Sequence, residues 1–316
     1  MKQYFLIMNP GSKSGRSKTL FSTIHNFFNE NKLEYDYEVT TTLEDAENIS
    51  KKASRKGYRK IVAVGGDGTI NRVLNGLYDN GKRNSSARFG VIYTGTSPDF
   101  CKSFNIPVNV EQSLLTLKRG YETEITPGFI RFAKNHTTNS SERNSHDSVF
   151  ACCANIGIGA DLAEAANSGI RGVIGDFAGT FISLLKTLIT FKSKSVTTKI
   201  NNSEQKIRNL YNLSVGKTHH VASGIKIKND LSFTDRRFYM LTVKDLTLFQ
   251  IPNCLKSLYG GKQITDSSIF EYTYLENIEI TGSNKPCRVE FDGDPAGYLP
   301  CKISTANDSL KLITDS

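Results

Sequence analysis

The sequence predicts an α/β domain built on a parallel sheet, followed by a second domain that is mainly antiparallel β-structure. Over residues 1–125, apolar segments of strand length alternate with amphipathic segments of helix length, which is the pattern of a parallel sheet covered by helices. Beyond this point the chain consists of short segments rich in β-branched and aromatic residues, which is typical of antiparallel strands. A chain of 316 residues is long enough for two such domains. We therefore expect a domain boundary near residue 125.

The first strand and helix are predicted on either side of a loop rich in small residues. Residues 4–8 are apolar and lead into Asn9-Pro10-Gly11-Ser12-Lys13-Ser14-Gly15, after which an amphipathic helix begins. Small and basic residues suit contact with a phosphate or a ribose, but a solvated loop explains them equally well. A second strand is predicted over 35–40, and a short helix follows over 45–56.

The centre of the first domain is predicted at residues 61–77. Ile61–Val64 is an uninterrupted apolar run, which suits a strand buried on both faces of a parallel sheet. Three glycines follow and permit either positive φ angles or the close approach of a bulky ligand to the backbone. The next residues predict a helix with one apolar face, at Ile70, Val73, Leu74 and Leu77.

This glycine turn, Gly65-Gly66-Asp67-Gly68, is a candidate phosphate site. A turn that leads into a helix N-terminus directs several backbone N–H groups and a partial positive charge at one point, where a phosphate binds. The carboxylate of Asp67 would repel a phosphate unless a cation lay between them. A magnesium–nucleotide complex therefore fits the turn better than a bare anion. The alternative is that the glycines serve turn geometry alone, which leaves Asp67 unexplained.

A third loop follows the strand predicted over 88–93. It contains Gly95 and Thr96, and a helix is predicted beyond it over 111–119. Parallel strands all end at one edge of their sheet, and ligands bind at that edge. The three loops are therefore expected to lie close together.

The second domain is predicted from a series of short strands, at residues 124–132, 148–154, 196–200, 209–215, 238–243, 268–274, 276–281 and 288–291. The segment 134–147 is polar and is predicted as a loop between them. An apolar helix is predicted over 179–191, followed by Lys192 and Lys194. Packing in the core is one interpretation of this helix, and a lid that faces a membrane is the other.

The composition limits the classes of partner. A net charge of +9 favours anionic partners, which are nucleotides, nucleic acids or an anionic membrane surface. Because no nucleic-acid-binding motif is visible, we place nucleic acid last. No apolar stretch is long enough to span a bilayer and no signal peptide is recognisable, so we expect a cytoplasmic protein. The six cysteines contain no C-x-x-C pair and are expected to be buried free thiols.

Together, the motifs resemble those of the diacylglycerol kinase catalytic-domain family, which includes bacterial lipid kinases and sphingosine kinases. They follow the family's order along almost the whole chain, and they are Asn9-Pro10 with the loop after it, Thr40, Gly65-Gly66-Asp67-Gly68-Thr69 with Asn71 and Asn75-Gly76, Gly95-Thr96 with Asp99-Phe100, Asn155 with Gly157, Gly159 and Asp161, and Asp292-Gly293-Asp294 with Gly297 and Pro300. The glycine turn alone is shared with NAD kinases, whereas the motifs at the two ends separate lipid kinases from them.

The resemblance implies a Rossmann-like, nucleotide-binding α/β domain and a β-sandwich that binds the lipid substrate, a fold similar to that of NAD kinases. It implies that residues 300–316 return to the first domain, so that the second domain covers 126–299. A lipid hydroxyl would receive the γ-phosphate of ATP in the cleft between the domains, with Mg²⁺ as cofactor. The nucleotide-binding residues would be Asn9, Lys13, Thr40, Gly65, Gly66, Asp67, Gly68, Thr69, Ile70, Asn71 and Thr96.

The resemblance also assigns catalytic roles. Asp292 would accept the proton of the lipid hydroxyl, with Asp294 as base or orienting group, and Asp67 would act on the magnesium ion. A simple hairpin turn is the alternative interpretation of the Asp-Gly-Asp segment. The chain departs from the family at Asp294, which replaces a glutamate, and at Pro98, which replaces an asparagine and has no backbone N–H.

A structural magnesium site is implied at Asp235. The backbone oxygens of Ser232 and Arg237 would be its other protein ligands, and a surface turn is the alternative. Arg236 replaces the glycine that the family has after this aspartate.

The main hypothesis is a lipid kinase in the cytoplasm, bound peripherally to an anionic membrane surface. A soluble NAD kinase-like enzyme that phosphorylates a small molecule is one alternative, and a catalytically inactive nucleotide-binding regulatory protein is another. The expected partner is a lipid acceptor such as diacylglycerol, nucleic acid is not expected, and a homodimer is left open.

Overall fold

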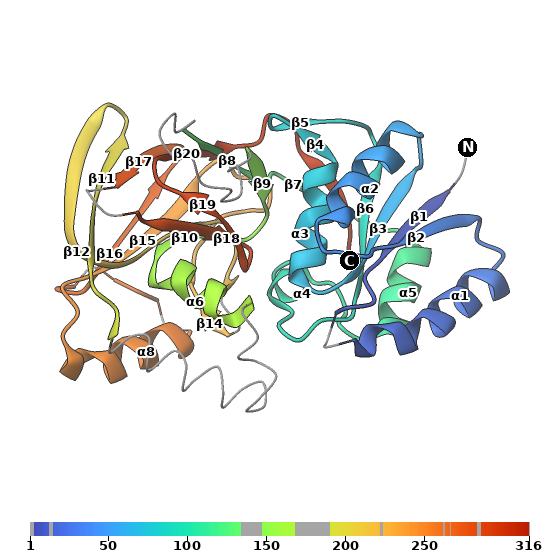
Figure 1. The fold of residues 1–316 in the computed structure, drawn as a ribbon, viewed down its shortest axis with the longest axis horizontal. Coiled ribbons are helices and arrows are strands. Elements are labelled where there is room, and N and C mark those ends of the chain that lie inside the picture. The colour runs from blue at the N-terminus through green and yellow to red at the C-terminus, as the bar shows by residue number, and fades with distance from the viewer. Residues whose placement is uncertain are drawn as a thin grey trace. The chain divides into compact units, whose positions relative to one another are not determined.

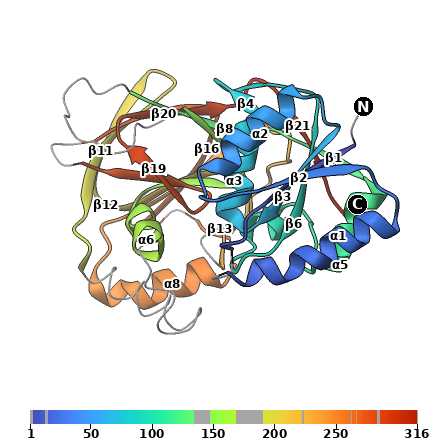
Figure 2. The same ribbon diagram turned by 45° about the vertical axis from the view of Figure 1, so that its right-hand side comes forward.

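The computed structural model describes residues 3–12, 15–133, 147–167, 190–221, 224–261, 263–265, 267–282 and 286–315. The chain divides into two compact units, which can be followed in Figures 1 and 2. Unit 1 consists of Met1–Pro127 and Ala306–Ser316, and unit 2 consists of Gly128–Thr305. The last segment of the chain therefore belongs to the first unit.

Unit 1 is built on a six-stranded sheet in the order β2-β1-β3-β6-β21-β7. Its strands are β1 (Tyr4–Met8), β2 (Tyr35–Val39), β3 (Lys60–Gly65), β6 (Arg88–Tyr93), β7 (Glu122–Ile125) and β21 (Leu310–Ile313). Neighbours from β2 to β21 pair in parallel, and β7 pairs antiparallel with β21 at the edge. The predicted parallel sheet is confirmed.

Helices cover both faces of this sheet. They are η1 (Arg16–Leu20), α1 (Phe21–Glu30), α2 (Asp45–Arg55), α3 (Asp67–Gly76), α4 (Asp99–Ser103) and α5 (Val110–Arg119), and β4 (Tyr78–Asp79) and β5 (Lys82–Arg83) form a small hairpin. In Figure 1, α1 and α5 lie on one face and α2 and α3 on the other. Ile24 and Phe28 of α1, with Leu114 and Leu117 of α5, pack against apolar side chains of β1, β3 and β6. Burial on both faces explains the uninterrupted apolar run in β3.

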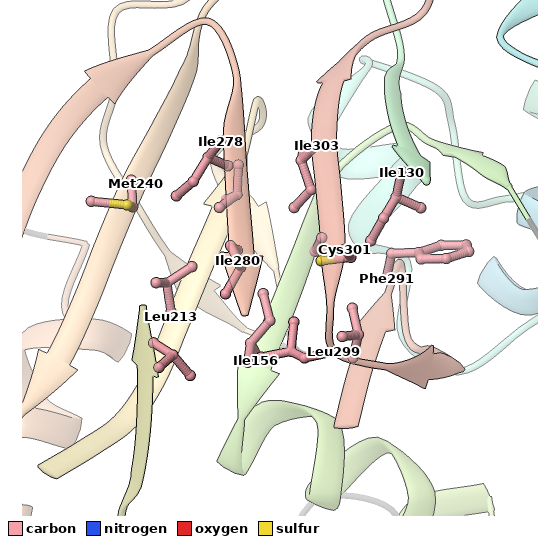
Figure 3. Close-up of a cluster of buried hydrophobic side chains, with 14 of the residues drawn as sticks. Ile130, Ile156, Leu213, Met240, Ile278, Ile280, Phe291, Leu299, Cys301 and Ile303 are labelled. Carbon is pink, nitrogen blue, oxygen red and sulfur yellow. The ribbon is translucent and has the colours of Figure 1, made fainter. Parts of the chain in front are cut away.

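Over its described residues, unit 2 is built on an antiparallel sheet of eleven strands. They are β8 (Gly128–Phe132), β9 (Ser148–Phe150), β10 (Cys153–Gly157), β11 (Lys194–Ile200), β12 (Ser203–Gly216), β15 (Phe238–Lys244), β16 (Phe270–Leu275), β17 (Ile278–Gly282), β18 (Arg288–Phe291), β19 (Asp294–Tyr298) and β20 (Cys301–Thr305). The order is β19-β18-β10-β12-β11-β17-β20-β8-β9, and β15 joins β12 to β16. Figure 3 shows the apolar core between these strands, which includes Ile156, Leu213, Ile280 and Ile303.

The remaining described elements of unit 2 are short. They are α6 (Ile158–Asn167), the hairpin of β13 (His220–Val221) and β14 (Ile225–Lys226), η3 (Leu248–Gln250) and α8 (Ile251–Tyr259). The predicted helix over 179–191 and the predicted loop over 134–147 lie largely outside the described residues. Among the helices that the structure does describe, none is both long and apolar enough to cross a membrane. All six cysteines are free and buried, as the sequence predicted.

Two predicted strands are each divided in two. The strand predicted over 124–132 is β7 in unit 1 and β8 in unit 2, because the chain passes between the units at Pro127, which has no N–H to donate. The strand predicted over 148–154 is β9 and β10, because the N–H groups between them donate to the Asp292 side chain.

The return to unit 1 also differs from the expectation. It begins at Ala306 instead of near residue 300. Residues Cys301–Thr305 form β20, which pairs with β8 and β17 and so belongs to unit 2.

Candidate functional site

The loops that follow β1, β2, β3 and β6 meet at one edge of the unit 1 sheet. The backbone N–H groups of Asn9, Thr40 and Thr94 each donate a hydrogen bond of 2.9 Å to the end of a neighbouring strand. The start of each loop is therefore fixed by the sheet itself. This edge is where an open α/β sheet binds its ligands.

Side chains of the first loop hold the glycine turn in place. Asn9 Nδ2 donates to Thr69 Oγ1 at 2.8 Å, and Asn9 Oδ1 accepts from Gly11 N at 2.9 Å. Ser12 Oγ accepts from Gly66 N at 3.2 Å. The side chain of Asn9 and the amide of Gly66, both expected to contact the nucleotide, are thus used within the protein to join two loops.

The glycines of the turn allow close packing and do not adopt positive φ. Gly65, Gly66 and Gly68 are absent from the residues with positive φ, and Gly66 is extended, with φ −91° and ψ −174°. A Cβ on Gly65 would lie 2.4 Å from the Thr69 side chain, and one on Gly95 would lie 2.6 Å from Gly66 Cα. The sequence predicted either positive φ or the close approach of a ligand, whereas the groups that approach Gly65 and Gly66 here are the Thr69 side chain and the Gly95 backbone.

The first turn of α3 supplies the candidate anion site. The helix begins at Asp67 and has no side-chain cap at Gly66. Its first amides have no partner within the helix, and they carry the positive end of the helix dipole. Asp67 Oδ2 accepts from Asp99 N at 3.3 Å, so the carboxylate lies between this turn and the third loop.

Thr40 carries a polar atom that suits a ligand at the same edge. Its hydroxyl oxygen is buried and has no hydrogen-bond partner among the residues that the structure describes. A buried hydroxyl without a partner costs free energy, and a bound polar ligand would remove that cost.

The other predicted nucleotide residues differ in exposure. Ile70 is buried in unit 1, so only its backbone is suited to ligand contact. Asn71 is also buried, and its Oδ1 accepts from Asn75 Nδ2 at 3.1 Å. Thr96 is exposed, and Lys13 lies outside the described residues.

In unit 2, the Asp292-Gly293 turn joins β18 to β19. Both residues have positive φ, 50° and 84°, which is the geometry that favours Asp-Gly in a two-residue hairpin. The Asp292 carboxylate accepts hydrogen bonds from the N–H groups of Ala151, Cys152 and Cys153, at 2.7, 2.9 and 3.1 Å. We call these three N–H groups the amide cradle. An ionised carboxylate has about four acceptor positions, so the cradle occupies most of them.

Glu290 is a buried acid that the sequence motifs did not single out. Its side chain accepts hydrogen bonds from Asn155 Nδ2 and, at 2.9 Å, from Gly293 N. Burial, together with the nearby carboxylates Asp292 and Asp294, raises the pKa of Glu290 to about 8, although the hydrogen bonds from Asn155 and Gly293 N act to lower it. The carboxyl group is therefore mainly protonated at neutral pH. The available signal was an acidic residue between two apolar residues, Val289 and Phe291, in the strand before the turn.

Asn155 connects this acid to the rest of unit 2. Its Oδ1 accepts from Ser214 Oγ at 2.6 Å and from Asn212 Nδ2 at 3.2 Å. Asn212 Oδ1 in turn accepts from Gly159 N at 2.9 Å, at the start of α6. The segment that resembled a family motif is thus a buried network that joins β10, β12, β18 and α6.

The predicted structural metal site does not present free ligands. Asp235 accepts from Arg237 N, Nε and Nη2 at 2.8, 3.1 and 2.7 Å, and Ser232 O accepts from Asp235 N at 3.1 Å. The Lys217 ammonium donates to Asp235 O and, at 3.2 Å, to Arg237 O. Burial lowers the pKa of Lys217 to about 8, so the group stays protonated at neutral pH. The described residues contain no cluster of acidic, His or Cys side chains suited to a metal. These residues do not fit a bound metal ion.

The protein therefore belongs to a class with two domains. One has a glycine turn at the edge of a parallel sheet, and the other is an antiparallel domain that carries the Asp292-Gly293 turn. Residues 3–130 match the sequence model of the diacylglycerol kinase catalytic domain. Residues 153–314 match that of the YegS C-terminal NAD kinase beta sandwich-like domain. The chain belongs to the diacylglycerol kinase catalytic-domain family.

Individual relatives cover nearly the whole chain. A diacylglycerol kinase of Bacillus subtilis is 25% identical over 95% of this chain and 92% of its own. A diacylglycerol kinase of Staphylococcus carnosus is 22% identical over 99% and 95%. A crystal structure of a diacylglycerol kinase from Bacillus anthracis shares 17% identity and has a TM-score of 0.67, with 99% and 97% of the two chains covered. The structural likeness supports the fold.

Proposed function

We propose that this protein is a lipid kinase that transfers the γ-phosphate of ATP to the hydroxyl group of a lipid such as diacylglycerol. Family membership and relatives named diacylglycerol kinase support this class of reaction. The observation that carries the proposal is the first turn of α3, where uncapped helix amides and the Asp67 carboxylate occur together. Amides alone suit any anion, whereas amides with a carboxylate suit a phosphate that is bound with Mg²⁺.

In this proposal the amides of Gly68 and Thr69 hold the phosphates and the Asp67 carboxylate binds the magnesium ion. The amide of Gly66 is left out, because it donates to Ser12. The Thr40 hydroxyl donates to the nucleotide from the adjoining loop. When bound, Mg²⁺ neutralises the charge that develops on the transferred phosphoryl group.

Asp292 is proposed as the base, with Asp294 as the alternative. A lipid hydroxyl loses its proton as it attacks phosphorus, and a carboxylate held in one orientation can accept that proton. The amide cradle provides that orientation for Asp292. Glu290 is unsuited to this role at neutral pH, because burial keeps it protonated.

Contact with a membrane surface is also proposed, because the proposed acceptor is a lipid. The net charge of +9 favours an anionic surface, and η3 presents Leu248 and Phe249, which are 61% and 94% exposed. A cytoplasmic location is part of this proposal, and a homodimer stays a prediction.

The decisive experiment incubates the purified chain with γ-labelled ATP, Mg²⁺ and vesicles that contain diacylglycerol, followed by organic extraction. We expect a labelled lipid, and a loss of about 10²–10⁴-fold in its rate of formation in Asp292→Asn. Asp230→Asn, an exposed aspartate of the same unit, is the matched control and should keep the wild-type rate. Label in a new water-soluble product would indicate a small-molecule kinase instead. ATP binding without transfer to any acceptor would indicate a regulatory protein.

A further inference from the structure

Lys217 is a buried cation beside the loop 232–237, where the family resemblance placed a metal ion. It follows β12 directly, and Arg237 directly precedes β15, the neighbouring antiparallel strand. Only 6% of the Lys217 surface is exposed. A lysine is almost never this deeply buried unless its charge is compensated.

The surroundings of the ammonium group are those that a cation requires. It donates to the backbone oxygens of Asp235 and Arg237, and it lies 4.7 Å from the centroid of the Phe238 ring. Backbone oxygens that converge on one point suit a hard cation, and an aromatic face attracts a positive charge. An ammonium group has three N–H donors and no acceptor, and here it donates to Arg237 O, one of the two backbone oxygens assigned to the metal ion, and to Asp235 O.

The carboxylate that a metal ion would need is already neutralised. Asp235 accepts three hydrogen bonds from Arg237, two of them from its guanidinium group. We infer that Lys217 is the built-in cation of the loop 232–237 and takes the place of a divalent metal ion there. The inference depends on the geometry within unit 2 and stands whether or not the protein is a lipid kinase.

The same lysine is connected to the amide cradle. Lys217 N donates to Cys152 O at 2.9 Å, and Cys152 N donates to Asp292 Oδ1 at 2.9 Å. The lysine therefore joins the loop 232–237 to the segment that orients Asp292. It is a positioning residue, and its position should not depend on divalent metal.

The first test uses the wild-type chain without nucleotide. Thermal unfolding and hydrogen exchange of a peptide that covers residues 228–237 would be measured in EDTA and in millimolar MgCl₂ or CaCl₂. We expect the same midpoint and the same exchange in all three solutions. A fall of the midpoint and faster exchange in EDTA, both abolished by Asp235→Asn, would overturn the inference.

The second test removes the cation. Lys217→Met keeps much of the side-chain length but leaves the backbone oxygens of Asp235 and Arg237 without this donor, so we expect the midpoint to fall by roughly 5 °C or more. Lys228→Met removes an exposed lysine close by and should leave the midpoint unchanged.

In Lys217→Ala, Mg²⁺ or Ca²⁺ should restore part of the lost stability. A Lys217→Met chain as stable as wild type would overturn the inference. The chelation experiment decides the matter if neither variant folds.

Discussion

Asp292 is held more firmly than an aspartate in a surface turn. Its carboxylate accepts three backbone N–H groups, and its own N–H donates to Cys153 O at 3.0 Å. In Asp292→Asn, the side-chain NH₂ group would face one of these donors. Some loss of stability is therefore expected in this variant, and thermal unfolding has to accompany its activity assay. Asp294→Asn leaves the cradle intact and is the cleaner comparison.

Glu290 should make the stability of unit 2 depend on pH. Its pKa is raised from the usual 4.5 to about 8 in the folded protein, so the folded state holds a proton that the unfolded state releases between these values. This stabilisation is fully present below about pH 4.5 and is lost as the pH rises towards 8. The slope approaches 1.4 kcal/mol per pH unit for one proton.

Glu290→Gln cannot ionise and should lose this part of the pH dependence. Urea unfolding of both chains at pH 5, 6, 7 and 8 checks the prediction. Equal slopes in the two chains would show that Glu290 does not carry the effect.

At the scale of elements, alanine substitutions can distinguish glycines that are needed for packing within the protein from glycines that leave room for a ligand. A Cβ on Gly95 would collide with the backbone of Gly66, so Gly95→Ala should destabilise the chain by about 1–3 kcal/mol. A Cβ on Gly68 would meet only Leu43, at 3.5 Å. Because alanine also favours a helix, Gly68→Ala should be as stable as wild type or more stable by about 0.5–1 kcal/mol.

If phosphates lie against the first turn of α3, Gly68→Ala should nevertheless weaken ATP binding by roughly tenfold or more. Isothermal titration of ATP with Mg²⁺ into this stable variant gives the answer directly. Unchanged affinity would place the phosphates elsewhere.

The 3₁₀ turn η3 is the element proposed to touch the membrane. Thr247 and Gln250 form a capping box, which fixes the turn that presents Phe249. Burial of a phenylalanine contributes about 1.5–3 kcal/mol, so Phe249→Ser should lower binding to anionic vesicles by about tenfold or more. Co-sedimentation is the measurement, with Val108→Ser of unit 1, which is also exposed, as the control. Equal losses in both variants would argue against a specific role for η3.

At the scale of the whole molecule, unit 1 depends on the end of the chain. Strand β21 lies between β6 and β7, and Leu310, Leu312 and Ile313 are buried. A chain that ends at Thr305 would lose this strand and expose both neighbours. We expect unit 1 of this truncated chain to be cleaved by protease under conditions in which the full chain resists. Removal of Ser316 alone is the control, and a truncated chain that still binds ATP would contradict the expectation.

Much of the fold and part of the candidate site follow from local patterns. The apolar run of β3, the glycine turn and the apolar face of α3 are neighbours in sequence, and their spacing alone predicts strand, turn and helix. The sequence placed the domain boundary near residue 125, but it gave no sign that the strand predicted over 124–132 is divided at Pro127, because residues of similar composition lie on both sides of it. Which strands pair across a sheet is a property of the whole chain.

By itself, the sequence determined the alternation of strands and helices, the position of the glycine turn and the Asp-Gly hairpin, since these depend on residues close together in the chain. Only the tertiary structure decided which donor meets which acceptor. Pairing of β10 with β18 sets Glu290 beside Asn155 and lays the amide cradle against Asp292, while pairing of β12 with β15 brings Lys217 to the oxygens of Asp235 and Arg237. These partners lie far apart in sequence, and only the packing of the sheet brings them within hydrogen-bond distance.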